Sequence, residues 1–346
     1  MKKIIISLLF ASVALFSCEK YESIKKVDND FKRNFEHFWT LVDEQYCYLD
    51  YKNIDWNQAK EDFMPRVEAA KDEFEFFQIL TEALDLLKDG HVWMLSQFQS
   101  YSCNTYLFDE NGVAYPDNFS TTLLKQYMKG NKLYHPLDSK VYYGTIEDGD
   151  RTYVYIYYTD FGTDWNSYVY KYILPLMEEA DGIILDIRDN PGGSGEIGLR
   201  LAGHFFDTKE HVGYYATKSG PGHNDFNEKE ELYVEPIKSA NWSNKPTMLL
   251  TNRNVYSTAN LFTSALQYAP NVTHIGGKSG GGGAMPMTHY LANGWLVVFP
   301  SNALFDRDGN HIECGIDPDI LIDADAEMEN GRDIIIERAI EELRKK

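Results

Sequence analysis

Two segments of this sequence carry residue types that can act on a carbonyl group. The apolar run 183–187 ends in a turn rich in glycine, and a second apolar run, 246–251, leads through a short turn to Ser257 at the start of a helical pattern. A serine hydroxyl can attack a carbonyl carbon, and free N–H groups at a helix N-terminus stabilise the negative oxygen that forms. The sequence therefore contains a candidate nucleophile, with the N–H group of Thr258 beside it.

Both segments also have a simpler structural interpretation. Gly192 and Gly193 expose backbone N–H groups that can hold an oxyanion, but glycine turns are common wherever a strand ends. Ser257 can equally be an ordinary N-cap, whose side-chain oxygen accepts a hydrogen bond from a helical N–H group. Both interpretations of Ser257 predict the same strand, turn and helix, so the surroundings of the serine must distinguish them.

Further motifs, taken in their order along the chain, resemble those of a known family. The segments are Leu87-Lys-Asp-Gly-His91, 182–193, 257–262, the glycine-rich 276–283 and 313–319. Together they resemble the C-terminal processing peptidase and tricorn-core family of serine peptidases over residues 30 to 325. The resemblance implies an α/β fold with a crotonase-like (ClpP-like) spiral protease core.

The resemblance also implies roles for individual residues. A lone histidine after a helix is usually structural, but in tricorn-like members the residue at the position of His91 is the general base. Glu313 matches the glutamate that supports this histidine. Gly192, Gly193 and Thr258 would supply the N–H groups for the oxyanion. Such a mechanism uses no metal or cofactor, and none is predicted.

The sequence departs from the family pattern at two positions. Gly90 replaces the serine that precedes the histidine in the tricorn core, so Glu313 would reach His91 directly or through another hydroxyl or a water. Gly282 stands where other members have a catalytic lysine, which leaves the nearby Lys278 as a second candidate base. The leading hypothesis is a serine endopeptidase, and the alternatives are a non-catalytic peptide- or ligand-binding protein and a hydrolase of other acyl substrates.

The N-terminus resembles a bacterial lipoprotein signal. Residues 1–18 combine a basic start with a short apolar run and a lipobox that ends at Cys18, the expected lipidation site. Residues 19–29 are expected to form a tether, 30–90 a helical subdomain and 91–346 the α/β peptidase core, without a complete PDZ module. We expect a protein of the cell envelope, periplasmic or outer-membrane, that is held by acyl chains and takes a peptide or protein substrate.

Composition limits the possible partners. The formal net charge of the 346 residues is -20, which argues against nucleic acid as a ligand. Three cysteines remain after Cys18, without a CxxC pair, so a disulfide framework or a zinc site is not expected. The run 276–283 lacks the first glycine of a phosphate-binding loop, because position 272 is Val272.

Three local features yield testable expectations. Pro65 is expected to end or kink a helix that begins at residue 56, because proline lacks the backbone N–H donor. Gly90 is expected to be the left-handed residue that ends the next helix. The polar segment 218–231 is expected to form an exposed loop over the site.

Overall fold

A computed structural model describes residues 30–104, 107–108, 114, 119–136, 140–163, 167–322 and 331–346. The expected signal segment, the tether and Cys18 lie outside these residues. Within them the α-helices are α1 (Phe31–Gln45), α2 (Trp56–Ala69), α3 (Glu73–Asp85), α4 (Thr121–Tyr127), α5 (Ser167–Glu179), α6 (Gly195–Ala202), α7 (Thr258–Leu266) and α9 (Ile334–Arg344). The strands are β1 (Trp93–Leu95), β2 (Ser100–Ser102), β3 (Val141–Asp148), β4 (Arg151–Tyr158), β5 (Gly182–Asp186), β6 (Glu210–Thr217), β7 (Glu230–Val234), β8 (Thr247–Thr251), β9 (Val272–Gly276), β10 (Ala284–Tyr290), β11 (Leu296–Phe305) and β12 (Ile320–Leu321).

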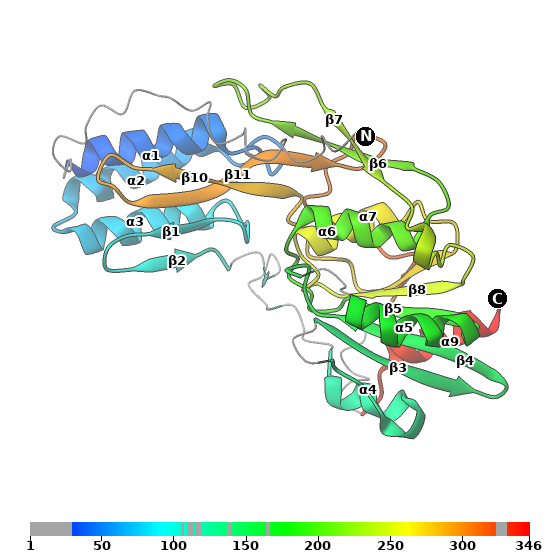
Figure 1. Ribbon diagram of the computed structural model, residues 1–346. Coiled ribbons are helices and arrows are strands. Elements are labelled where there is room, and N and C mark those ends of the chain that lie inside the picture. Colours follow the sequence, from blue (N-terminus) through cyan, green and yellow to red (C-terminus); the bar gives the residue numbers. More distant parts are fainter. Residues whose placement is uncertain are drawn as a thin grey trace, which may run out of the picture.

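The helices α1, α2 and α3 bury aromatic faces against the first sheet. Each begins after an aspartate whose side chain accepts a backbone N–H bond, and this satisfies one of the free donors of the first turn. Phe35 and Phe38 on α1 and Phe77 on α3 are fully buried, in one cluster with residues of β1 and β11. Figure 1 shows the three helices beside β1, β10 and β11, at one end of the molecule.

Pro65 does not end α2, so that part of the prediction is wrong. The helix continues through Pro65 to Ala69, although proline cannot donate the usual backbone bond. Val67, in the turn that follows, is buried in the helical core. Its packing keeps this last turn helical despite the lost donor.

The structure is of mixed α/β type and its described strands form two sheets. In the first, the order is β2-β1-β11-β6-β7, and β10 pairs with β11. In the second, the order is β12-β9-β8-β5-β4-β3. Neighbours from β4 to β12 are parallel, whereas β3 and β4 form an antiparallel pair. Every residue of β5 and of β8 is buried, as expected for parallel strands covered on both faces.

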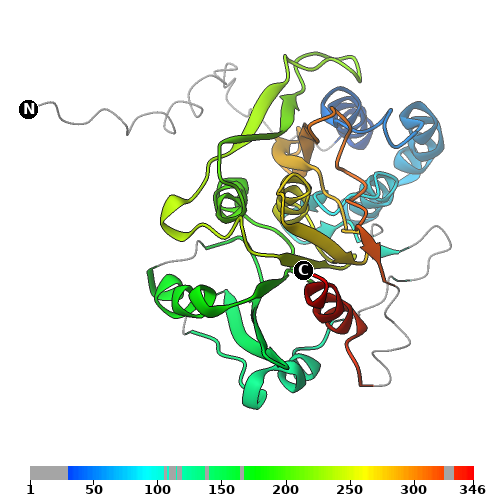
Figure 2. The same ribbon diagram turned by 90° about the vertical axis from the view of Figure 1, so that its right-hand side faces the viewer.

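Helices cover both faces of the second sheet. Ile183 and Leu185 of β5 face a core that includes α5, α6 and α7, while Ile184 faces the core under α9. Figure 2 shows α9 on the side of β8 opposite to α6 and α7. This sandwich fixes the ends of β5 and β8, and with them the two turns that the sequence singled out.

Candidate active site

The two candidate turns leave the second sheet side by side. Since β5 and β8 are parallel neighbours, with Asp186 opposite Leu250, both chains emerge at the same edge. Side chains then lock the turns together: Asn252 Nδ2 and Asn254 Nδ2 donate to Asp189 Oδ1, at 2.8 and 2.9 Å. The backbone N–H of Asp189 donates to Asn252 Oδ1, at 3.0 Å.

Ser257 occupies the N-cap position of α7 without acting as a side-chain cap. Its backbone has φ 57° and ψ -122°, a region that costs a non-glycine residue on the order of 1–3 kcal/mol. The neighbouring chain holds this conformation, because Ser257 N donates to Gly281 O and Tyr256 N donates to the backbone oxygen of Asn190, at 2.9 and 3.0 Å. The hydroxyl forms no capping bond. It is directed instead toward a histidine.

His91 Nε2 lies 2.9 Å from Ser257 Oγ, within hydrogen-bonding distance. His91 stands in the loop between α3 and β1. His91 and Ser257 are far apart in sequence, but Tyr256, next to Ser257, packs against His91. The centroid of the Tyr256 ring lies 5.0 Å from that of the imidazole. Tyr256 also accepts the backbone N–H of Gly90, at 2.9 Å. The pair that sequence analysis could only propose therefore meets in the fold.

The loop before His91 is shaped differently from expectation. α3 ends at Asp85, and the residue with positive φ is Lys88, at 45°, not Gly90. Lys52 Nζ contacts the carbonyl oxygens of Leu87 and Lys88, at 3.1 and 3.4 Å. The prediction of Gly90 as a left-handed cap is therefore wrong, because tertiary contacts place the strained residue two positions earlier.

The three N–H groups proposed to bind the oxyanion differ in whether they already have a hydrogen-bond acceptor. The N–H of Gly192 donates to Asn190 Oδ1, at 2.9 Å, and so is already used. The N–H groups of Gly193 and Thr258 have no acceptor within the residues that the structure describes. The hydroxyl of Thr258 donates to Gly193 O, at 2.7 Å, and links the two turns. Gly193 and Thr258 are therefore the better candidates, and Gly192 has a packing role.

Gly192 is where the two turns touch most closely. Its φ is 100°, and an added Cβ would lie 2.8 Å from Ser257 Cβ and 2.7 Å from Thr258 N. We expect Gly192→Ala to displace Ser257, with a loss of more than about tenfold in activity and of about 1–3 kcal/mol in the free energy of unfolding. Gly149→Ala is the matched control for denaturant unfolding, since Gly149 has φ 65° and nothing within 4 Å of an added Cβ. Equal effects of the two substitutions would contradict the packing role.

A buried network of charged groups lies behind His91. Asp89 Oδ1 accepts the backbone N–H of His91 at 2.9 Å, and it lies 3.9 Å from His91 Nδ1. Lys52 Nζ contacts Asp89 Oδ2 at 3.3 Å and Glu313 Oε1 at 2.7 Å. Glu313 Oε2 accepts the N–H of Gly283, at 2.8 Å. No hydrogen bond within the described part of the chain joins Glu313 to His91, so Glu313 is connected to the histidine only through Lys52 and Asp89.

Burial and charge shift the pKa values of this network. Burial raises the pKa of Glu313 to about 7, although Lys52 counteracts the shift. Burial opposes the charge on Asp89, but Lys52 and His91 together hold the pKa of Asp89 below its usual value. The pKa of His91 is lowered, chiefly by burial. The imidazole is therefore neutral near pH 7 and can accept a proton.

Lys52, Asp89 and Tyr256 belong to the site, although the sequence motifs did not indicate them. Asp89 stands inside the segment 87–91, so its distance of two residues from His91 was an available signal. Lys52 and Tyr256 carry no comparable signal, because only the fold brings them to Asp89; Tyr256 Oη lies 3.3 Å from Asp89 Oδ1.

Lys278 is not placed to serve as the base. Its Nζ lies 3.2 Å from Asp317 in an exposed ion pair, and no contact within the described residues joins it to Ser257. Only glycine fits at position 282, because an added Cβ would lie 2.5 Å from the Tyr256 ring. Tyr256 thus fills the space into which a side chain at this position would extend.

The side-chain hydrogen bonds of the loop 218–231 lie away from Ser257 in the described part of the chain. His223 hydrogen bonds to Asp43 and Asp50, at 3.1 and 2.6 Å, beside the N-terminal helices. No hydrogen bond of this segment within the described residues reaches Ser257 or His91, so the expectation of a loop over the site is not supported.

The described residues contain no group of three or more His, Cys, Asp or Glu side chains arranged to hold a metal ion. No described helix combines the length and apolar character needed to cross a membrane. No disulfide joins Cys47, Cys103 and Cys314.

A strained serine on a strand-turn-helix junction, a histidine in contact with it and two N–H groups without an acceptor among the described residues match the geometry expected of a serine hydrolase. Residues 152–322 match the model of peptidase family S41, and residues 27–85 match the tricorn protease C1 domain. A crystal structure of a protein from Parabacteroides merdae superposes with a TM-score of 0.82 at 32% identity, over 91% of this chain and 97% of that one. The chain belongs to peptidase family S41, and is thus a member of a serine peptidase family.

More distant relatives share parts of this architecture. The carboxy-terminal processing protease CtpA of Bacillus subtilis is 29% identical over 142 residues, which are 41% of this chain and 28% of that protein. The chain thus aligns with less than a third of the length of the curated relatives it matches. Mature CPAF in complex with lactacystin has the same fold, with a TM-score of 0.66 at 11% identity, over 92% of this chain and 99% of that one.

Proposed function

We propose that this protein is a serine endopeptidase that hydrolyses peptide bonds in peptides or unfolded protein segments at the cell envelope. The observation that carries the proposal is the 2.9 Å contact between His91 Nε2 and Ser257 Oγ. A non-catalytic binding protein would not need this contact, whereas a base must reach the proton that it removes.

The proposed reaction has two stages. His91 Nε2 takes the proton of the Ser257 hydroxyl while Oγ attacks the carbonyl carbon of the scissile bond. The N–H groups of Gly193 and Thr258 bind the oxyanion, and His91 then gives its proton to the leaving amine as the C–N bond breaks. Water, deprotonated by His91, hydrolyses the acyl-enzyme in the second stage and restores Ser257.

Asp89 is proposed to orient His91, and Glu313 is proposed to support Asp89 through Lys52. Asp89 holds the backbone N–H of His91 and places a negative charge 3.9 Å from Nδ1, which stabilises the imidazolium. Glu313 shares Lys52 with Asp89 and so keeps the ammonium in place. The support for His91 is therefore a chain of charges rather than a direct glutamate contact.

This arrangement predicts a specific pH profile. Because His91 acts as a base only when neutral and burial lowers its pKa from 6.5, kcat/KM should rise with pH through a midpoint below 6.5 and stay high at neutral pH. Asp89→Asn removes a charge that raises this pKa, so the midpoint should move lower and the maximal rate should fall. Glu82→Gln, in an exposed pair with Arg66, is the control and should leave the profile unchanged. A midpoint above 6.5, or an unshifted midpoint in Asp89→Asn, would contradict these roles.

The proposed function is tested by a peptide digest combined with a serine-directed phosphonate. The wild-type protein should cleave unfolded substrates, and the phosphonate should stop cleavage while one label appears on Ser257 in the mass spectrum. Cleavage that survives complete labelling would overturn the proposal, and a substrate panel that includes simple esters would identify a hydrolase of other acyl groups.

The cellular setting is part of the proposal. We infer acylation of Cys18 and a periplasmic or outer-membrane location from the N-terminal sequence. We also propose that the chain consists of a signal segment (1–18), a tether (19–29), a helical subdomain (30–90) and a peptidase core (91–346). A crotonase-like spiral core without a complete PDZ module is also inferred. Metabolic labelling with a fatty acid, compared with Cys18→Ala, tests the anchor directly.

A further inference from the structure

A pocket of about 390 Å³ lies beside Tyr256, the residue before Ser257, and we name it the rear pocket. Its lining residues are Lys52, Lys88, Arg253, Tyr256, Lys278, Gly280, Gly282, Glu313 and Cys314. Four of these side chains are cationic and one is a carboxylate, although the chain has 53 acidic and 33 basic residues. A concentration of positive charge on an acidic protein points to an anionic ligand.

The cations come from separate loops and differ in their availability. Lys52 is buried and already bonded to Asp89 and Glu313, so it forms the floor. Lys88 forms no ion pair within the described residues. Among the residues that the structure describes, Lys278 pairs only with Asp317, in an exposed contact that another carboxylate can replace. Arg253 contributes a third positive charge to the lining.

The position of the rear pocket decides which part of a substrate could reach it. Tyr256, in its wall, directly precedes Ser257 and lies against the His91 ring. Gly193 and Thr258, the candidate oxyanion residues, are not among the lining residues. Lys52 and Glu313 do line it, and Lys52 contacts Asp89, the residue beside His91, so the pocket lies toward the histidine. Because His91 must protonate the leaving amine, the leaving segment of a substrate starts on this side.

We propose that the rear pocket binds carboxylate side chains of the substrate on the leaving-group side of the scissile bond, and so selects acidic peptides. The inference rests on the proposed peptidase function and adds a substrate class to it. Lys88, Arg253 and Lys278 supply the attraction, while the Lys52–Glu313 pair forms the floor.

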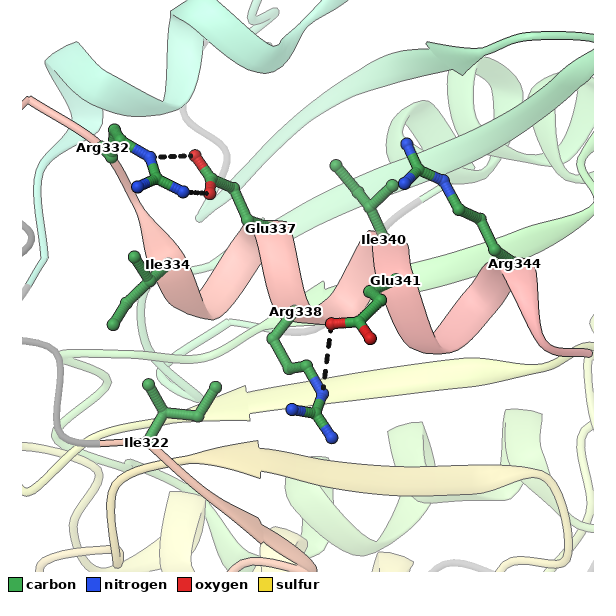
Figure 3. Close-up of a pocket in the computed structure, with 8 residues that line it drawn as sticks. All are labelled: Ile322, Arg332, Ile334, Glu337, Arg338, Ile340, Glu341 and Arg344. Atoms are coloured by element: carbon green, nitrogen blue, oxygen red, sulfur yellow. Dashed lines mark hydrogen bonds and ion pairs between the residues drawn. The ribbon is translucent and has the colours of Figure 1, made fainter.

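Another pocket of the described structure does not have this character. It is a hollow of about 640 Å³ along α9, drawn in Figure 3. Its charges are matched within the fold, since Arg332 pairs with Glu337, Arg338 with Glu341 and Arg344 with Asp148. It contains no residue of the Ser257–His91 site, and we assign it no ligand.

The test is a set of quenched fluorescent peptides in which one glutamate is moved along the leaving segment, each with a glutamine partner. At the best position the wild-type protein should cleave the glutamate peptide with a kcat/KM about three- to tenfold higher, as expected for a few exposed ion pairs. This preference should shrink as salt is added. Glutamate on the acyl side of the scissile bond should give no such preference.

Charge reversal tests the assignment to this pocket. The double variant Lys88→Glu/Lys278→Glu should prefer the glutamine peptide, whereas Lys129→Glu, at an exposed lysine paired with Glu147, should keep the wild-type preference. A wild-type protein that cleaves both peptides equally at every position, or a double variant with unchanged preference, would overturn the inference.

A separate binding measurement keeps the inference independent of catalysis. In Ser257→Ala, fluorescence anisotropy should show the glutamate peptide binding more tightly than the glutamine peptide, and adding Lys88→Glu/Lys278→Glu should reverse this order. If the wild-type protein cleaves nothing but this difference is present, the proposed activity fails and the pocket assignment stands. Equal binding of both peptides refutes the pocket assignment.

Discussion

Ser257→Ala is expected to lower the rate of peptide hydrolysis by at least about a thousandfold, with the fold retained. The hydroxyl is the group that forms the acyl-enzyme, and no second nucleophile is in hydrogen-bond contact with His91 Nε2 within the described residues. Lys278 cannot replace the base or the nucleophile, because its ammonium lies in an exposed pair with Asp317. The rate is measured with the best peptide from the substrate digest, and folding by circular dichroism.

The matched control for this substitution is Ser219→Ala. Ser219 is exposed in the segment 218–231, so its variant should cleave peptides at the wild-type rate. A folded Ser257→Ala protein with wild-type activity would eliminate the proposed mechanism. A wild-type protein that is as inactive as Ser257→Ala, yet binds peptides, would instead favour the non-catalytic alternative.

Features that depend on local sequence were predicted well. The buried strands β5 and β8 and the helix that starts after Ser257 follow from apolar runs and turn residues close to one another in the chain. The family motifs then indicated that His91 and Ser257 would meet. The role of each remains a proposal, whereas the distance between them is a property of the fold.

Features that depend on the direction of one hydrogen bond were not predictable. Gly192 and Gly193 are equivalent in sequence, but the side chain of Asn190 takes the N–H of Gly192 and leaves that of Gly193. Likewise, glycine adopts a positive φ more easily than lysine does, yet Lys88 and not Gly90 has the positive φ. The reason is that Lys52 binds the carbonyl oxygens of Leu87 and Lys88. Such choices are made by tertiary contacts between segments far apart in sequence.

Arg188 lies within the motif segment 182–193, and its side chain stabilises the fold. Its guanidinium is fully buried between Asp186 and Asp333, with Nη2 at 2.6 Å from Asp186 Oδ2 and at 2.8 Å from Asp333 Oδ2. Asp333 also accepts the N–H of Ile336 and so caps α9. One side chain thereby ties the end of β5, and the turn with Gly192 and Gly193 that follows it, to the C-terminal helix.

Arg188→Met is therefore expected to lower the free energy of unfolding by about 3–5 kcal/mol, because two buried carboxylates lose their counter-charge. Urea unfolding measures this loss. Burial already raises the pKa of Asp186, with Arg188 counteracting the shift. Without the arginine, lowering the pH should reduce the difference from wild type, since protonation neutralises the Asp186 carboxylate, whose pKa is already raised.

The control for Arg188→Met is Arg344→Met, which breaks an exposed pair with Asp148 and should leave unfolding nearly unchanged. The triple variant Asp186→Asn/Arg188→Met/Asp333→Asn should recover part of the lost stability, because no uncompensated charge remains buried. If Arg188→Met alone were as stable as the wild type, the ion cluster could not be what anchors the end of β5. The position of Gly193 would then have to depend on the asparagine contacts between the two turns alone.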